Sequence, residues 1–189
     1  AGIGMRALFP EEGFTVSELI DDVAYKLCMM GYMLHSGRAD NTDLKFEIGC
    51  QRAESQGGKG GHKIFLPKDT FNWKTRDGLT YLSKKDIAKD VADRARALTL
   101  ELHPNPSKLG HFGLHAMDRN AYQVLGKDLN TPVDFVIICA LNSVFDDKGN
   151  IIDCKGGTGQ AVRIAARYNI PVFNLLHTPH YERIKAFVE

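Results

Sequence analysis

The chain has 189 residues, of which 43% are hydrophobic, and its 24 basic and 23 acidic side chains give a formal net charge of +1. A chain of this length buries roughly 70% of the surface that it exposes when unfolded, so its core needs no disulfide or structural metal. The composition excludes a small disulfide scaffold and a disordered tail. The near-zero charge excludes a broad basic face, which argues against a general DNA-binding protein.

The cysteine pattern and the hydropathy of the sequence indicate in which cellular compartment the protein is expected. The four cysteines, Cys28, Cys50, Cys139 and Cys154, form no CxxC pair, which favours free buried thiols. No stretch reaches about 18 uncharged apolar residues, and no charged-then-apolar leader opens the chain. We therefore expect a soluble cytoplasmic protein that does not associate with membranes. The histidine spacings fit no metal-binding template, so we expect neither a metal nor a cofactor.

In the first half of the chain, helical and strand-like patterns alternate. Apolar residues recur at steps of three and four over residues 15–31, which predicts a helix with one buried face. A short strand over 32–35 and a helix over 44–53 follow. A loop with four glycines covers 56–61, and residues 63–66 are typical of a strand that ends at a proline.

The second half continues this alternation. Ser83 is expected to cap a helix that runs to about residue 100, and 133–141 is nearly all apolar, as a strand buried on both faces of a parallel sheet requires. The remaining expected elements are a short helix over 118–125, a loop over 142–155, a helix over 157–168, a strand over 170–175 and a last helix over 179–188.

Strands that alternate with helices form βαβ units, whose right-handed crossovers build an open parallel sheet. We predict the α/β class, with a Rossmann-like open parallel sheet that has helices on both faces, in a single domain over residues 1–189. Ligands of such sheets bind at the carboxyl ends of the strands. The strand-to-helix loops are therefore the candidate site, and three of them qualify.

The first candidate loop is the segment AGIGMR. Gly2 and Gly4 let the backbone pass close to a ligand, and Arg6 can donate to a phosphate or a carboxylate. An ordinary tight turn with a solvent-facing arginine explains these residues equally well.

The second candidate loop, residues 35–43, turns from a strand into a helix. Its backbone N–H groups point at the space above the strand, where a phosphate fits. The residues that we assign to this site are Ser36, Gly37, Arg38, Asp40, Asp43 and Glu47. Asp40 and Asp43 are alternatively N-caps, and Glu47 either reaches a ribose hydroxyl or faces solvent.

The third candidate loop has the strongest signal, because three glycines fall within four residues at the start of a helix. The residues assigned here are Gly156, Gly157, Thr158, Gly159 and Gln160. Each glycine costs backbone entropy, which a close ligand or a strained turn offsets. The loop has neither the Walker A ending nor the GxGxxG spacing, which argues against ATP hydrolysis of that type and against a dinucleotide dehydrogenase.

Four segments together resemble the SLOG superfamily, which includes DprA and the LOG phosphoribohydrolases: AGIGMR, LHSGRADNTDLKFEIG, AMDRNAYQVLG and GGTGQAVRIAARYNIPVFNL. The likeness is greatest to small SLOG proteins of bacteriophages. It implies a Rossmann-like fold whose glycine loops bind a nucleotide-derived ligand, in a homo-oligomer. By the same resemblance Arg119 and Asn120 line the ligand site; alternatively, they brace their helix.

The resemblance also bears on catalysis. LOG enzymes cleave the bond between a base and ribose 5′-phosphate with a PGGxGTxxE motif, and aligning its glycines places Arg163 at the glutamate. Because that acid is missing, we assign no catalytic residue and expect binding without turnover. Arg163 then contacts an extra phosphate or forms a surface salt bridge. The carboxylates that can substitute for the acid are Asp40, Glu47 and Asp118.

Other SLOG domains bind nucleotide signals of bacterial antiviral defence, including ADP-ribose derivatives. The resemblance therefore implies a phage protein that sequesters such a signal in the infected cell. The alternatives are a LOG-like N-glycoside hydrolase and a DprA-like single-strand binder. Lysines 84, 85 and 89 are opposed by aspartates 86, 90 and 93, which disfavours the DNA-binding alternative.

Three aromatic residues, Phe71, Trp73 and Tyr81, lie in a segment without periodicity. Each can stack on a base. We expect instead that they pack a long loop onto the sheet or form a subunit contact.

Overall fold

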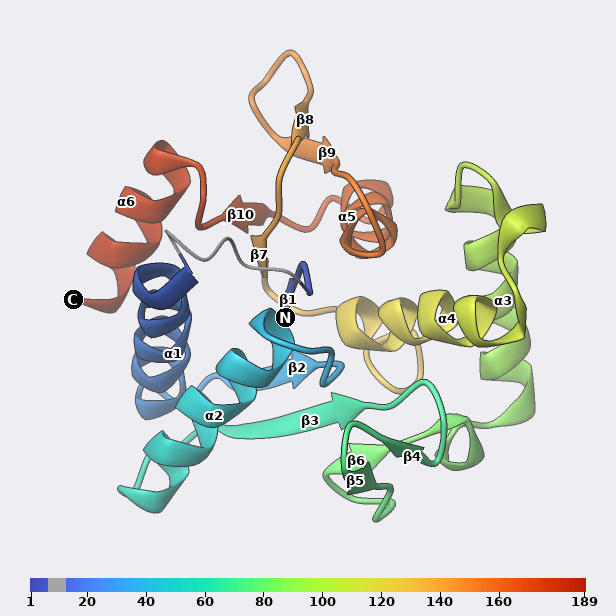
Figure 1. Ribbon diagram of the computed structural model, residues 1–189, viewed down its shortest axis with the longest axis horizontal. Helices are drawn as coiled ribbons and strands as arrows, with labels where there is room; N and C mark the ends of the chain where they lie inside the picture. The colour runs from blue at the N-terminus through green and yellow to red at the C-terminus, as the bar shows by residue number, and fades with distance from the viewer. Residues whose placement is uncertain (7–12) are drawn as a thin grey trace.

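The computed structural model describes residues 1–6 and 13–189 (Figure 1). The elements of the first half are β1 (Gly2–Gly4), α1 (Gly13–Met29), β2 (Met33–Ser36), α2 (Thr42–Ser55), β3 (Gly61–Phe65), β4 (Thr70–Phe71), β5 (Lys74–Thr75) and β6 (Tyr81–Leu82). Those of the second half are α3 (Lys89–Leu102), α4 (His111–Leu125), β7 (Val136–Cys139), β8 (Val144–Phe145), β9 (Ile151–Asp153), α5 (Thr158–Arg167), β10 (Val172–Asn174) and α6 (Thr178–Val188).

Two three-stranded parallel sheets form the centre of the fold, in the orders β1-β7-β10 and β2-β3-β6. The predicted α/β class with parallel strands is therefore confirmed. These strands form two sheets and not one continuous sheet. The Ser36 hydroxyl, at the end of β2, donates a hydrogen bond to the Gly2 carbonyl oxygen at 2.6 Å and links β2 to β1.

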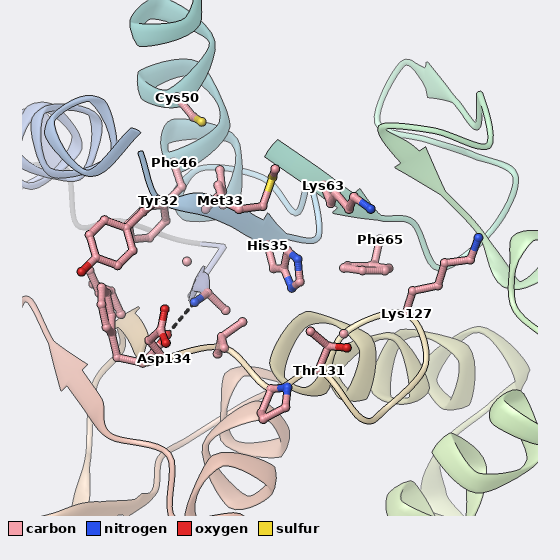
Figure 2. A pocket seen from close by; sticks show the side chains of 18 of the residues that line it. Tyr32, Met33, His35, Phe46, Cys50, Lys63, Phe65, Lys127, Thr131 and Asp134 are labelled. Atoms are coloured by element: carbon pink, nitrogen blue, oxygen red, sulfur yellow. Dashed lines mark hydrogen bonds between the residues drawn. The ribbon is translucent and has the colours of Figure 1, made fainter. Parts of the chain in front are cut away.

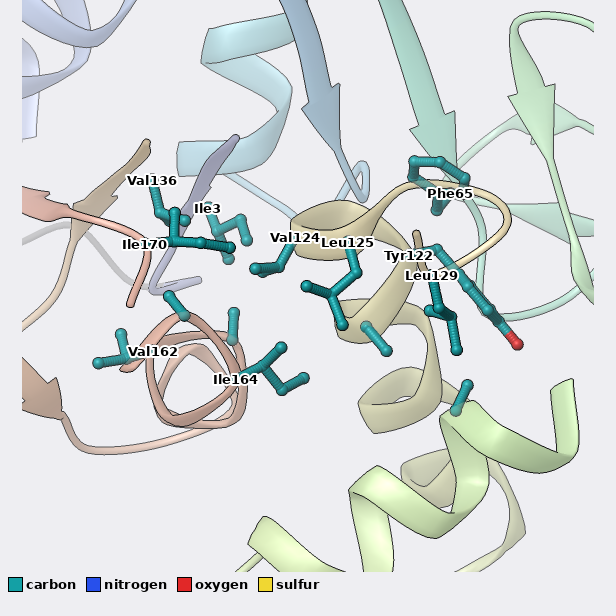
Figure 3. Close-up of a cluster of buried hydrophobic side chains, with 14 of the residues drawn as sticks. Ile3, Phe65, Tyr122, Val124, Leu125, Leu129, Val136, Val162, Ile164 and Ile170 are labelled. Atoms are coloured by element: carbon teal, nitrogen blue, oxygen red, sulfur yellow. The ribbon is translucent and has the colours of Figure 1, made fainter. Parts of the chain in front are cut away.

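Helices cover both faces of the sheet that contains β7. The side chains of β7 alternate between two hydrophobic clusters, one on each face. Val136 and Ile138 point into a cluster that α3, α4 and α5 complete, drawn in Figure 3. Ile137 and Cys139 point into a second cluster that contains residues of α1, α2 and α6. All four side chains are buried, as expected for a strand in the middle of an α/β protein.

The glycines of β1 make room for a helix. A Cβ atom on Gly2 would lie 2.5 Å from the ring of Phe46, and one on Gly4 would lie 2.3 Å from Cγ2 of Thr42. Both of these neighbours belong to α2. Close packing of α2 against β1 therefore accounts for both glycines and sets the start of α2 beside the carboxyl end of β1.

Two helix boundaries differ from the sequence prediction. Ser83 caps only a short 3-10 turn, Lys84–Asp86, and α3 begins at Lys89 because Ile87 and Ala88 are extended. Helix α4 begins at His111, well before the predicted residue 118. Gly113 lies inside this helix, where glycine costs about 1 kcal/mol relative to alanine, and packing of α4 against α3 and α5 offsets that cost.

Two short hairpins occupy segments predicted to lack regular structure. The strands β4 and β5 pair within the aromatic segment, and β8 and β9 pair between β7 and the third glycine loop. The second hairpin projects from the body at the top of Figure 1. In the described parts of the chain, no helix combines the length and the apolar character needed to cross a membrane.

Candidate functional site

The loop after β1 is fastened to the start of α2. The side-chain amide of Asn41 donates to the carbonyl oxygen of Arg6, and the Gly4 N–H donates to Oδ1 of Asp43 at 3.1 Å. The first and second candidate loops therefore form one structural unit at the carboxyl ends of β1 and β2. The Arg6 side chain is exposed.

Neither aspartate of the second loop is an N-cap, because α2 begins at Thr42 and its N-cap is Asn41. Asp43 lies in the first turn, buried, and also accepts from the Ala39 N–H at 3.3 Å. Burial is the main cause that raises the pKa of Asp43, against the opposing effect of the nearby Arg119. Asp40 is exposed and accepts from the amide of Asn72 at 3.0 Å.

Helix α4 joins the second loop to the third through two consecutive residues. The buried Arg119 donates from Nη1 to the carbonyl oxygen of Gly37. Asn120 donates from Nδ2 to the carbonyl oxygen of Gly157 at 3.1 Å. A Cβ on Gly37 would lie 2.4 Å from Nη1 of Arg119, so glycine at this position makes room for the guanidinium. The predicted alternative was that Arg119 and Asn120 brace their own helix. The observed hydrogen bonds instead fasten the second and third candidate loops to α4.

Several buried polar atoms around this junction have no hydrogen-bond partner within residues 1–6 and 13–189. They are Nε of Arg119, both amide atoms of Gln123 and Nε2 of Gln160. A buried polar group without a partner costs about 1–3 kcal/mol, so these atoms mark where a ligand or ordered water would be stabilised. Sequence reasoning missed Gln123, although its place four residues after Arg119 puts both side chains on one helix face.

The glycines of the third loop serve two different purposes. Gly156 has a φ of +83° and, like Gly157, leaves its missing side chain facing largely open space. A Cβ on Gly159 would instead lie 2.2 Å from the carbonyl oxygen of Cys154, so packing explains that glycine. Gly156 and Gly157 therefore leave the start of α5 exposed, while Thr158 and Gln160 are buried beneath it.

Arg163 forms the salt bridge that was predicted as one of its two alternatives. Its Nη1 lies 2.5 Å from Oδ1 of Asp153, and its Nη2 donates to Oε1 of Gln160 at 3.3 Å. The guanidinium is thereby directed at the end of the β8–β9 hairpin.

Glu47 is fully buried, so the alternative prediction, that its side chain faces solvent, is wrong. Its Oε1 accepts hydrogen bonds from Arg38 and from the Tyr81 hydroxyl, the latter at 2.7 Å. Its Oε2 has no partner among the described residues. Arg38 also donates from Nε to the Asn72 carbonyl oxygen at 2.9 Å. The aromatic segment thus contributes Asn72 and Tyr81 to this cluster, a long-range contact without a signal in the sequence.

Trp73 lies next to Asn72 and is 99% exposed, whereas Tyr81 is 5% exposed. The Asn72 amide donates to the Arg38 carbonyl oxygen at 2.8 Å and fixes this segment against the second loop. The predicted packing role is therefore correct for Tyr81 and wrong for Trp73 within this chain. Trp73 is instead exposed, next to the residue that contacts the second loop.

A separate cavity of about 690 Å³ is lined by residues of β2 and β3 and by residues at the amino ends of β1 and β7 (Figure 2). It is mainly lined by apolar side chains, and of the residues assigned to the ligand site Gly2 alone contributes to its lining. Burial lowers the pKa of His35 in its wall to about 4, which favours the neutral imidazole.

The site therefore combines the exposed start of α5 with the start of α2, where Thr42 and Asp43 are buried. It adds the buried Arg119, whose Nε has no partner among the described residues, buried carboxylates and a neighbouring segment that carries the exposed Trp73. This set can bind an anion that carries a polar and an aromatic part. Comparisons of the chain with protein-family models, with curated proteins and with solved structures found no match.

Proposed function

We propose that the protein binds a nucleotide-derived ligand of the ADP-ribose or cyclic-nucleotide type at the carboxyl ends of its strands and holds it without cleaving it. The observation that carries this proposal is the pair of bonds from Arg119 and Asn120, which fixes the loops before α2 and α5 on one helix. Each helix start offers N–H groups and the positive end of the helix dipole to a phosphate. Two such starts suit a ligand with more than one phosphate.

The base and the ribose have candidate contacts beside the phosphate loops. The exposed indole of Trp73 offers a stacking surface for a base. Asp40, in the second loop, is joined to the Trp73 segment by the hydrogen bond that it accepts from Asn72. Glu47 presents an unpartnered Oε2 that can accept from a ribose hydroxyl.

Binding without turnover is favoured because Asp118, one of the three possible substitute acids, is engaged in the fold. Asp118 accepts a two-pronged contact from Arg96, with Nε 3.0 Å from Oδ1 and Nη2 2.7 Å from Oδ2. Arg163, at the position of the LOG glutamate, is paired with Asp153. Together with the resemblance to SLOG proteins, this supports a phage protein that sequesters a bacterial immune signal in the cytoplasm of the infected cell.

One observation favours a second candidate function, a nucleotide N-glycoside hydrolase. Glu47 has one oxygen held by Arg38 and Tyr81 and the other buried without a partner among the described residues. A positioned carboxylate of this kind can act as a nucleophile or a general acid–base group.

Analysis of released ligand distinguishes the two functions. The purified protein is incubated with ADP-ribose or a cyclic dinucleotide, separated from free ligand and denatured by heat, and the released molecules are identified by mass spectrometry. We expect the intact ligand to be recovered in a stoichiometric amount. Recovery of free base together with the remaining base-free sugar phosphate would contradict sequestration, and loss of these products in Glu47→Gln would then assign the hydrolysis to Glu47.

A further inference from the structure

Three metal-ligating side chains converge away from the nucleotide site, where α1 packs against α2. Cys28 lies near the end of α1, and Cys50 and Glu54 lie one turn apart on α2. Their two sulfur atoms and a carboxylate oxygen lie within 4.8 Å of one another. Ligand atoms around one tetrahedral zinc ion are about 3.5–4 Å apart, given bond lengths of about 2.0–2.3 Å. A small movement of the three side chains toward one another would therefore bring three ligand atoms to the distances of a tetrahedral site.

His62, in β3, supports the carboxylate of this cluster. Its Nδ1 lies 2.9 Å from Oε1 of Glu54, and its side chain is only 10% exposed. Metal-binding residues are commonly oriented by such hydrogen bonds to a neighbouring group. His62 thus holds Glu54 toward the two sulfur atoms.

The glycine-rich loop over residues 56–61, which has no part in nucleotide binding, closes over the same two cysteines. The Gly60 N–H donates to the Cys28 carbonyl oxygen at 2.9 Å, and the Cys50 thiol donates to the Gly61 carbonyl oxygen at 3.1 Å. A Cβ on Gly60 would lie 2.2 Å from the Tyr32 carbonyl oxygen. Glycine at residue 60 is therefore needed for the backbone to approach this cluster.

We propose that Cys28, Cys50 and Glu54 bind a thiophilic divalent metal ion of the zinc class, with His62 as a positioning residue and water in the fourth position. Soft thiolate ligands select zinc over magnesium or calcium. Binding releases the two thiol protons to solvent, so the site neutralises the charge of the ion with two thiolates. The site is independent of the proposed nucleotide function, and it departs from the sequence expectation that the protein holds no metal.

The cavity lined by β2, β3 and the amino ends of β1 and β7 supplies an entry path. Cys28 and Cys50 both line it, and Figure 2 shows Cys50 on α2 above the strands. An ion can therefore reach the thiols without separation of α1 from α2.

Cobalt substitution tests this site on the full chain. The protein is reduced, freed of metal with a chelator and titrated with Co²⁺, whose thiolate charge-transfer and visible absorption bands report tetrahedral sulfur coordination. We expect bands that saturate at one equivalent and are displaced by Zn²⁺. The control variant Cys154→Ala removes a buried thiol outside the cluster and should keep the bands.

The cluster variants decide the assignment. Cys28→Ser and Cys50→Ser should each abolish the sulfur charge-transfer band, and His62→Asn should weaken Co²⁺ affinity by about 10- to 100-fold while the band persists. Circular dichroism before metal addition checks that each variant is folded. Absence of the bands in the folded wild-type protein, or their persistence in both serine variants, would overturn the proposal. A Cys28–Cys50 disulfide formed in air, with no metal uptake by the reduced protein, would overturn it as well.

Discussion

The two glycine-rich loops lie at opposite ends of the strands and differ in what surrounds them. The loop before β3 is enclosed by backbone, as shown by the 2.2 Å between a Cβ on Gly60 and the Tyr32 carbonyl oxygen. In the loop before α5, Gly156 and Gly157 face largely open space beside Asn120. A glycine run alone does not indicate a ligand site. The surroundings of each missing side chain separate close packing from an exposed backbone.

Of the substitutions that test the difference between the two loops, Gly60→Ala is expected to change the free energy of unfolding most. The added methyl group meets two backbone carbonyl oxygens, those of Tyr32 and Cys28, which cannot move aside as a side chain can. We expect the free energy of unfolding to fall by about 3 kcal/mol, measured by urea denaturation.

The matched change in the other loop, Gly157→Ala, should lower the free energy of unfolding by less than about 1 kcal/mol. Its methyl group would meet only the end of the Met117 side chain, at 3.3 Å. Equal losses of unfolding free energy in Gly60→Ala and Gly157→Ala would contradict the distinction between a closely packed loop and an exposed one.

A smaller effect is expected for Trp73→Ala. The indole is 99% exposed, so its removal should leave stability unchanged while nucleotide affinity falls about tenfold, or about 1.4 kcal/mol. Calorimetric titration measures the affinity, with Leu79→Ala as the control because Leu79 is exposed in the same segment. Trp73 is the sole tryptophan in the sequence, so its fluorescence in the wild-type protein should change when a base stacks on it. Equal affinities in all three proteins would show that Trp73 does not contact the ligand.

Elements with strong periodicity or a continuous apolar run were predictable from the sequence. The pattern over 15–31 marked α1, and the run over 133–141 marked β7, whose observed extent is Val136–Cys139. The four cysteines are buried and unpaired, as predicted. The hairpins β4–β5 and β8–β9 were missed because strands of two or three residues are too short to show a period.

The candidate site was predictable as a set of loops but not as a set of contacts. The sequence indicated that the segments around Gly37 and Gly157 would lie at strand ends, because parallel sheets present their loops there. It did not indicate that Arg119, 82 residues from Gly37, joins them. The burial of Glu47 likewise depends on Tyr81, whose place is set by the pairing of β6 with β3.

Calorimetric titration of ADP-ribose and of a cyclic dinucleotide into the wild-type protein and Gly157→Val tests the nucleotide site most directly. Gly157 has a φ of −63°, which valine tolerates, and an added Cβ would lie 3.3 Å from the end of the Met117 side chain, so the variant should fold with a melting temperature only slightly below that of the wild type. Gly110→Val serves as the control, since a Cβ at residue 110 would meet nothing within 4 Å. We predict binding of at least one ligand by the wild type and the control, and affinity at least a hundredfold weaker in Gly157→Val. Equal affinity in all three proteins, or binding of neither ligand by the wild type, would contradict the account.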